Sequence, residues 1–104
     1  MEAEVLKHLY DVEDAASAIA RFVRHRTFDD YEVDELLRSA VERKFEIIGE
    51  ALNRIRRIDS AVLETIRDYR DIISFRNILI HGYDSVDHRI VWGALPYLVW
   101  VGCI

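Results

Sequence analysis

Apolar residues in the first quarter of the chain recur at steps of three and four. They are Val5, Leu9, Val12, Ala16, Ile19 and Val23. This spacing places side chains on one face of an α-helix, which we predict from about Ala3 to His25. The opposite face then carries Glu4, Lys7, Asp11, Asp14 and Arg21. The pattern is typical of a helix with one side in a core and the other in water.

A second apolar stripe predicts a longer helix, from about Val33 to Arg57. Its members are Leu37, Val41, Phe45, Ile48, Leu52 and Ile55, at steps close to a heptad repeat. Gly49 falls inside this helix, where glycine costs about 1 kcal/mol relative to alanine. A close approach by another backbone, in a tight crossing or a dimer, is a physical reason for it. The cluster Thr27-Phe28-Asp29-Asp30 offers N-cap side chains and predicts a helix–helix corner.

The second half of the chain also favours helices. Asp59 and Ser60 can cap a short helix reaching Arg67. The apolar run Ile72–Ile80 is rich in β-branched residues, but we predict a helix because a lone strand leaves its backbone groups unpaired. Asp87 is predicted to cap a last helix that ends near Val101.

Four main helices and one short helix predict an all-α, antiparallel up-and-down bundle. The chain has four glycines and one proline, too few for an architecture of strands and turns. Its 104 residues, 51% hydrophobic and 32% charged, suit one domain over 1–104 that buries a core. Because a core of this size is marginal, association with a second copy is expected.

Charge and targeting signals narrow the class of protein further. The chain has 14 basic and 19 acidic residues, a net charge of −5 that argues against coating nucleic acid through a broad basic surface. The net charge does not exclude a local basic site that binds nucleic acid. Cys103 is the single cysteine and the first residues lack a secretory signal pattern, so a reducing cytoplasm is expected. The apolar end, residues 90–104, is shorter than a bilayer span and contains Pro96, which favours a buried helix.

The densest candidate chemistry is the run Arg-Asn-Ile-Leu-Ile-His-Gly-Tyr at residues 76–83. Asn77 and His81 are four residues apart, so on a helix they share a face and the amide can orient the imidazole. Arg76 lies five residues from His81, about 140° around an ideal helix. Its side chain must therefore reach around the helix end, or a second copy of the chain must complete the site.

These residues resemble a known family. The pattern Arg-Asn-x-x-x-His-x-Tyr follows an Ala-Val-Glu-Arg block at 40–43 and a Glu-Ile-Ile-Gly-Glu-Ala block at 46–51. It is followed by Val86-Asp87 and Val91-Trp92. Taken together and in this order, they resemble the HepT-like branch of the HEPN proteins, from about Leu6 to Leu98.

The resemblance implies a metal-independent endoribonuclease without a cofactor, the toxin of a type VII HEPN/nucleotidyltransferase toxin–antitoxin pair. It implies a homodimer whose cleft between protomers holds RNA, with Arg76 and His81 as the catalytic pair. Asn77 supports them by orienting His81 or by binding a phosphate oxygen. The expected antitoxin is a minimal nucleotidyltransferase, which silences the toxin by AMPylating Tyr83.

Other readings of the same residues stay open. Arg76 and His81 can be a structural pair favoured by a helix C-terminal dipole, and Tyr83 can be a packing aromatic. The bundle is then a non-catalytic helical adaptor that binds a nucleotidyltransferase. A metal site could draw on His81, Asp84, Asp87 and His88, but turn and N-cap roles explain the two aspartates better.

We expect structural roles for several residues outside the motif. The basic groups Arg21, Arg24, Arg26 and Arg54, Arg56, Arg57 are expected to be solvated helix ends, with an RNA-flanking or partner-docking role as the alternative. His8 and His25 are expected at the surface. Trp92 and Trp100 are expected in the core or at a dimer interface.

Overall fold

The computed structural model describes residues 2–64 and 87–102, and it describes side chains as far as Leu95. In chain order the helices are α1 (Ala3–Phe22), α2 (Phe28–Val33), α3 (Glu35–Ile58), α4 (Ser60–Leu63) and α6 (His88–Gly102). No strand occurs in these ranges. The all-α prediction is therefore confirmed, while the predicted helix at 72–80 lies outside the described residues.

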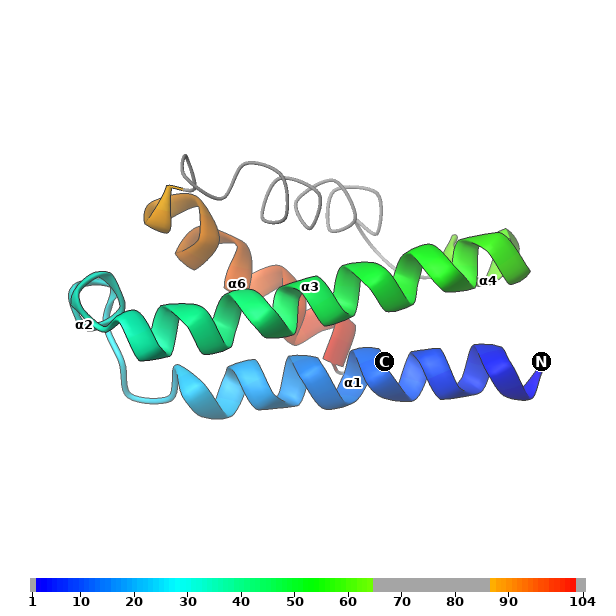
Figure 1. Ribbon diagram of the computed structural model, residues 1–104, viewed down its shortest axis with the longest axis horizontal. Helices are drawn as coiled ribbons and strands as arrows, with labels where there is room; N and C mark the ends of the chain where they lie inside the picture. Colours follow the sequence, from blue (N-terminus) through cyan, green and yellow to red (C-terminus); the bar gives the residue numbers. More distant parts are fainter. Residues whose placement is uncertain (1, 65–86, 103–104) are drawn as a thin grey trace.

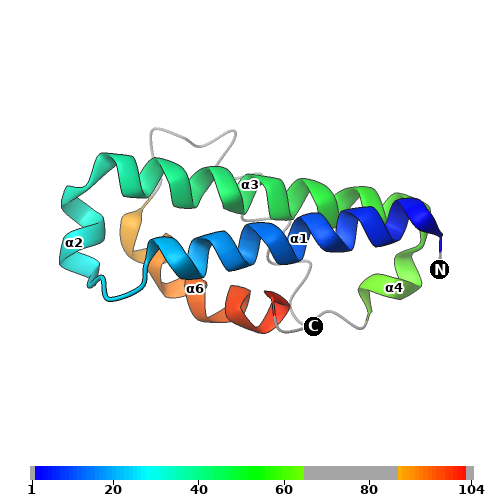
Figure 2. The ribbon, with the colours of Figure 1, turned by 90° about the horizontal axis from the view of Figure 1, so that it is seen from below.

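The two long helices α1 and α3 form the frame of the fold. They run side by side in opposite directions and make the most extensive contact between any two of the described helices (Figure 1). α6 begins beside α2 and runs back along α1, which places it on one side of the α1–α3 pair (Figure 2). The described helices thus form an antiparallel arrangement around a shared apolar interior.

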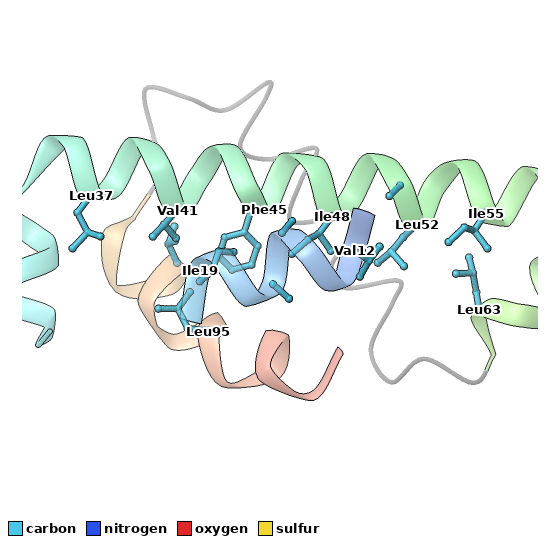
Figure 3. Close-up of a cluster of buried hydrophobic side chains, with 14 of the residues drawn as sticks. Val12, Ile19, Leu37, Val41, Phe45, Ile48, Leu52, Ile55, Leu63 and Leu95 are labelled. Atoms are coloured by element: carbon cyan, nitrogen blue, oxygen red, sulfur yellow. The ribbon is translucent and has the colours of Figure 1, made fainter. Parts of the chain in front are cut away.

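The apolar interior is built on the heptad-like stripe of α3. All six predicted stripe residues are buried, and Val41, Ile48, Leu52 and Ile55 have no exposed surface. The same cluster contains Val5 of α1. Figure 3 shows the stripe beside Val12 and Ile19 of α1 and Leu95 of α6. Burying one such side chain contributes about 1.5–3 kcal/mol, so this stripe is the main stabilising feature of the fold.

α1 ends earlier than its apolar pattern predicts. The helix stops at Phe22, with Val23 as its C-cap, and His25 adopts a left-handed backbone with φ of 61°. A β-carbon is disfavoured in this conformation, which glycine adopts at no steric cost. The predicted extension to His25 was wrong. The apolar pattern includes Val23, but the helical backbone has already ended at Phe22.

The corner between α1 and α3 contains a helix that the pattern did not predict. Thr27 closes a capping box: the N–H of Asp30 donates to Thr27 Oγ1 at 3.2 Å, and the N–H of Thr27 donates to Asp30 Oδ2 at 2.9 Å. The hydrogen bond from the Thr27 backbone lowers the pKa of Asp30. α2 has only six residues, too few to show a helical period in the sequence.

Aspartates cap α3, α4 and α6, as predicted for Asp59 and Asp87, whereas the N-cap of α1 is Glu2, without a side-chain hydrogen bond. Asp59 accepts from the N–H of Ala61 at 3.2 Å and Asp87 from that of Arg89 at 2.8 Å. Asp34 caps α3 in the same way. α4 ends at Leu63, so the predicted stretch up to Arg67 lies mostly outside the described residues. Among the described helices, none is both long and apolar enough to cross a membrane.

Candidate functional site

The predicted motif residues Arg76, Asn77, His81 and Tyr83 lie outside the described residues. The structure instead shows the two helices between which this segment runs in the sequence. Leu63 of α4 is fully buried and points toward Ile55 of α3 (Figure 3). The nearest described element before the motif in the sequence is therefore anchored in the core.

The first described helix after the motif in the sequence is α6. Asp87 caps this helix, and Val91 and Leu95 bury its inner face. Trp92 is partly buried against the core, with its ring centroid 5.3 Å from that of Tyr31 and 6.4 Å from that of Phe28. Trp92 therefore packs against the core, one of the two places expected for it, while the side chain of Trp100 lies outside the described residues.

The two upstream blocks at 40–43 and 46–51 both lie on α3. Val41, Ile48, Gly49 and Ala51 are buried on its inner side. On the outer side, Arg43 pairs with Glu46 at 3.2 Å and Arg54 with Glu50 at 3.0 Å. These blocks therefore serve the packing of α1 against α3 and supply charged side chains on the surface of α3 that borders α1.

A partly buried polar cluster, here called the α6 corner, draws its members from α2, α3 and α6. Its members are Tyr31, Glu42 and His88. The rings of Tyr31 and His88 pack edge to face with centroids 6.3 Å apart. Tyr31 is fully buried, and neither its hydroxyl nor Nδ1 of His88 has a hydrogen-bond partner in the described part of the chain.

Burial governs the charges of the α6 corner. It raises the pKa of the Tyr31 hydroxyl, which is further raised by the charge of Glu42. Burial also raises the pKa of Glu42, and the charges of His88 and Arg38 partly oppose this rise. Sequence reasoning missed the corner, because its members come from three separate helices and share no motif.

A charged groove lies between α1 and α3. It encloses about 240 Å³ and is lined by Lys7, His8 and Asp11 of α1 and by Arg43, Glu46, Ile47, Glu50, Ala51 and Arg54 of α3. Lys7 pairs with Asp11 at 3.3 Å. Each of the three cations that line the groove therefore has a carboxylate partner, so the groove offers little net charge to an anion.

His8 lies at this groove, and its predicted surface position was wrong. Only 5% of the residue is exposed, and its two ring nitrogens each lie 3.9 Å from a carboxylate oxygen, one of Glu4 and one of Asp11. His8 is three residues after Val5 and four before Val12, so it shares their buried face. His25 is exposed, as expected.

The alternative readings of the charged residues can now be compared with the structure. Asp87 acts as an N-cap, and the described residues contain no group of ligands suited to a metal ion. Asp84 and His81 lie outside them. Arg26 pairs with Asp34 at 3.7 Å and Arg54 with Glu50, which agrees with solvated helix ends balanced by neighbouring acids.

Comparison with known proteins places the chain in a family. The family model described as "Ribonuclease HepT-like" matches residues 12–97. The "Probable ribonuclease HepT" of Thermococcus cleftensis is 36% identical over 82% of this chain and 76% of its own length. The "Putative RNase MJ1380" of Methanocaldococcus jannaschii is 29% identical over 86% of this chain and 81% of its own.

A third relative, "Putative RNase TTE0752" of Caldanaerobacter subterraneus subsp. tengcongensis, is 33% identical over 67% of this chain and 62% of its own length. No solved structure matches the chain. The family match spans α3, the α6 corner and the whole Arg-Asn-x-x-x-His-x-Tyr motif. The chain therefore belongs to the HepT-like ribonuclease family.

Proposed function

We propose that this protein is a metal-independent endoribonuclease that acts as the toxin of a type VII HEPN/nucleotidyltransferase toxin–antitoxin pair. The observation that carries the proposal is the family match over residues 12–97, which includes Arg76 and His81. The nearest described helices before and after the motif, α4 and α6, are anchored in the core by Leu63, Val91 and Leu95. A stable frame of this kind suits a site that must hold its groups in fixed relation.

His81 is the proposed proton-transfer group. Cleavage of RNA without a metal needs a group that moves protons between the 2′-hydroxyl, solvent and the leaving oxygen. Histidine titrates near neutral pH, and such general acid–base catalysis contributes about 10²–10⁴ in rate. Asn77 orients the imidazole of His81 or binds a phosphate oxygen.

Arg76 is the proposed electrostatic partner. The transition state gathers negative charge on the non-bridging oxygens of the phosphorus centre. A guanidinium can meet two of these oxygens with parallel hydrogen bonds. Because Arg76 and His81 do not stack along one straight helix, we propose that the cleft between the two protomers of a homodimer brings them together.

Tyr83 is the proposed site of inhibition. An adenylate on its hydroxyl adds bulk and negative charge two residues from His81, so RNA is repelled and blocked. The proposed enzyme for this transfer is a cognate minimal nucleotidyltransferase, the antitoxin of the pair.

Expression in growing cells tests the proposal. The wild-type chain is expected to stop growth and to fragment total RNA, and both effects are expected to disappear in Arg76→Ala and His81→Ala. The matched control is Arg24→Ala, which removes an exposed arginine outside both the motif and the groove between α1 and α3. Undiminished RNA cleavage in His81→Ala overturns the catalytic assignment. If soluble wild-type protein has no effect, the non-catalytic adaptor becomes the better account.

A further inference from the structure

The groove between α1 and α3 holds a buried imidazole without a hydrogen bond in the described part of the chain. His8 lines the groove and is only 5% exposed. Its ring nitrogens lie 3.9 Å from carboxylate oxygens of Glu4 and Asp11, which is beyond hydrogen-bond distance. The large majority of buried polar side-chain atoms in native proteins are paired. The imidazole, which can donate from one nitrogen and accept at the other, is therefore placed to bond a molecule in the groove.

The charged side chains of the groove differ in how deeply they are enclosed. Each cation is paired with a carboxylate of its own helix: Lys7 with Asp11, Arg43 with Glu46, and Arg54 with Glu50. The side chains of the cations are 56–70% exposed, while those of the carboxylates are 27–36% exposed. The carboxylates are therefore the more enclosed groups, and the cations form a solvated rim.

This arrangement narrows the chemistry of an occupant. A free anion meets cations that are already paired, and the described residues contain no group suited to a metal ion. An apolar molecule would remove water from the charged walls without replacing its hydrogen bonds, which is costly. A neutral molecule with N–H groups can donate to the enclosed carboxylates, and an anionic group attached to it can stay at the cationic rim.

A nucleotide of RNA has both of these parts. Its base is neutral and carries N–H donors and acceptors on its edge, and its phosphates lie outside the base. Carboxylates and arginines are side chains that read base edges, and guanidinium planes also stack on bases. The groove encloses about 240 Å³, below the roughly 300–1,000 Å³ of pockets for drug-sized ligands, so it suits a single base.

We propose that this groove binds one unpaired base of an RNA strand. Asp11, Glu46 and His8 bond the edge of the base. Lys7 and Arg54 lie at the rim, where they face the flanking phosphates. The proposal rests on the proposed ribonuclease function and adds to it a site of base recognition that lies outside the Arg-Asn-x-x-x-His-x-Tyr motif.

Binding of free nucleosides tests the site without catalysis. Adenosine, cytidine, guanosine and uridine are titrated separately into the protein, and the backbone amide resonances of α1 and α3 are followed. At least one nucleoside is expected to shift the amides that line the groove, while ribose and inorganic phosphate leave them in place. No shift with any nucleoside overturns the proposal. Equal shifts with ribose or with phosphate overturn it too, since they show a sugar site or an anion site.

Substitutions of the enclosed carboxylates locate the contact. Asp11→Asn and Glu46→Gln keep the size of each side chain, and each is expected to weaken the Kd of the bound nucleoside roughly tenfold, because a charge-assisted hydrogen bond is lost. Asp14→Asn is the matched control, since it makes the same change one turn along α1 at an exposed position outside the groove. Equal weakening in the control, or none in both test variants, overturns the proposal. Neither test depends on replacing the buried His8.

Cleavage of a mixed-sequence RNA pool separates the base site from the function on which it rests. The cuts made by the wild type are expected to share one base at a fixed distance from the cleaved bond, and Asp11→Asn and Glu46→Gln are expected to lose this preference. An unchanged preference in both variants overturns the base site. A wild-type protein that cleaves no RNA overturns the proposed function instead, and the nucleoside titrations then decide the base site alone.

Discussion

The two faces of α3 use their side chains in opposite ways. The inner face presents an apolar stripe that is almost entirely buried against α1 and α6. The outer face presents ion pairs between residues three or four apart, such as Arg43 with Glu46 and Arg54 with Glu50, in which the arginine is exposed and the glutamate partly buried. Burial of apolar area is worth several times more than an exposed ion pair, whose contribution is about 0–1 kcal/mol. The inner face therefore stabilises the fold, while the outer face mainly keeps it soluble.

Glu42 lies between these two regimes. It is half-buried, and burial raises its pKa because the ionised carboxylate is disfavoured there. Unlike the apolar residues of the inner face, it carries a group whose charged form burial disfavours. Substitutions at the inner face, the α6 corner and the outer face should therefore change the stability of the fold by different amounts, and some should raise it while others lower it.

The largest expected effect comes from the inner face. Phe45 is 2% exposed at the centre of the core, and Phe45→Ala should lower the free energy of unfolding by about 3–5 kcal/mol through lost burial and a residual cavity. Urea denaturation followed by circular dichroism measures this loss. A loss under about 1 kcal/mol would show that the stripe is not the main stabilising feature.

The α1–α2 turn offers a smaller effect of the opposite sign. His25→Gly removes the β-carbon at the left-handed backbone position and should raise the free energy of unfolding by about 0.5–1 kcal/mol. His25→Ala is the matched control, because it removes the imidazole and keeps the β-carbon. If both variants gain the same free energy of unfolding, the loss of the imidazole explains the gain and the backbone conformation does not.

The α6 corner predicts a pH-dependent effect. A carboxyl whose pKa is raised by folding binds its proton more tightly in the folded state, so stability is highest at low pH and is lost as pH rises through the folded pKa. Glu42→Gln should therefore melt at a slightly higher temperature than the wild type at pH 7. The difference should vanish at acidic pH, where Glu42 is protonated. Melting curves that differ equally at both pH values would contradict this origin.

The smallest effect is expected on the outer face. Arg43 is largely exposed, and Arg43→Gln removes its pair with Glu46, which should change the free energy of unfolding by less than about 0.5 kcal/mol. Added salt should reduce even this difference, since it screens exposed charges. A loss of more than about 1 kcal/mol in the free energy of unfolding would contradict the account, in which the ion pairs of the outer face contribute little to stability.

The sequence predicts those parts of the fold that repeat at a helical period. The stripe of α3 and most of α1 were predicted because six apolar residues in each recur over several turns, and the aspartate caps at Asp59 and Asp87 follow from local backbone needs. α2 was missed because six residues are too few for a period. The burial of His8 could have been inferred from its place between Val5 and Val12.

The candidate site also has one part that a local sequence pattern predicts and one part that it does not. The motif Arg-Asn-x-x-x-His-x-Tyr is a local pattern and is readable from the chain alone. The α6 corner joins Tyr31, Glu42 and His88 from three helices, and no spacing in the sequence brings them together. Contacts of this kind depend on how the helices pack, which only the folded structure shows.

The most direct test of the central claim is cleavage of a mixed-sequence RNA oligonucleotide by the purified protein in the presence of EDTA. We expect the wild type to cleave it, and Arg76→Ala and His81→Ala to lose about 10²–10⁴ in rate while remaining folded. Cleavage that stops when EDTA is added, or a His81→Ala variant that cleaves at the wild-type rate, would contradict the account.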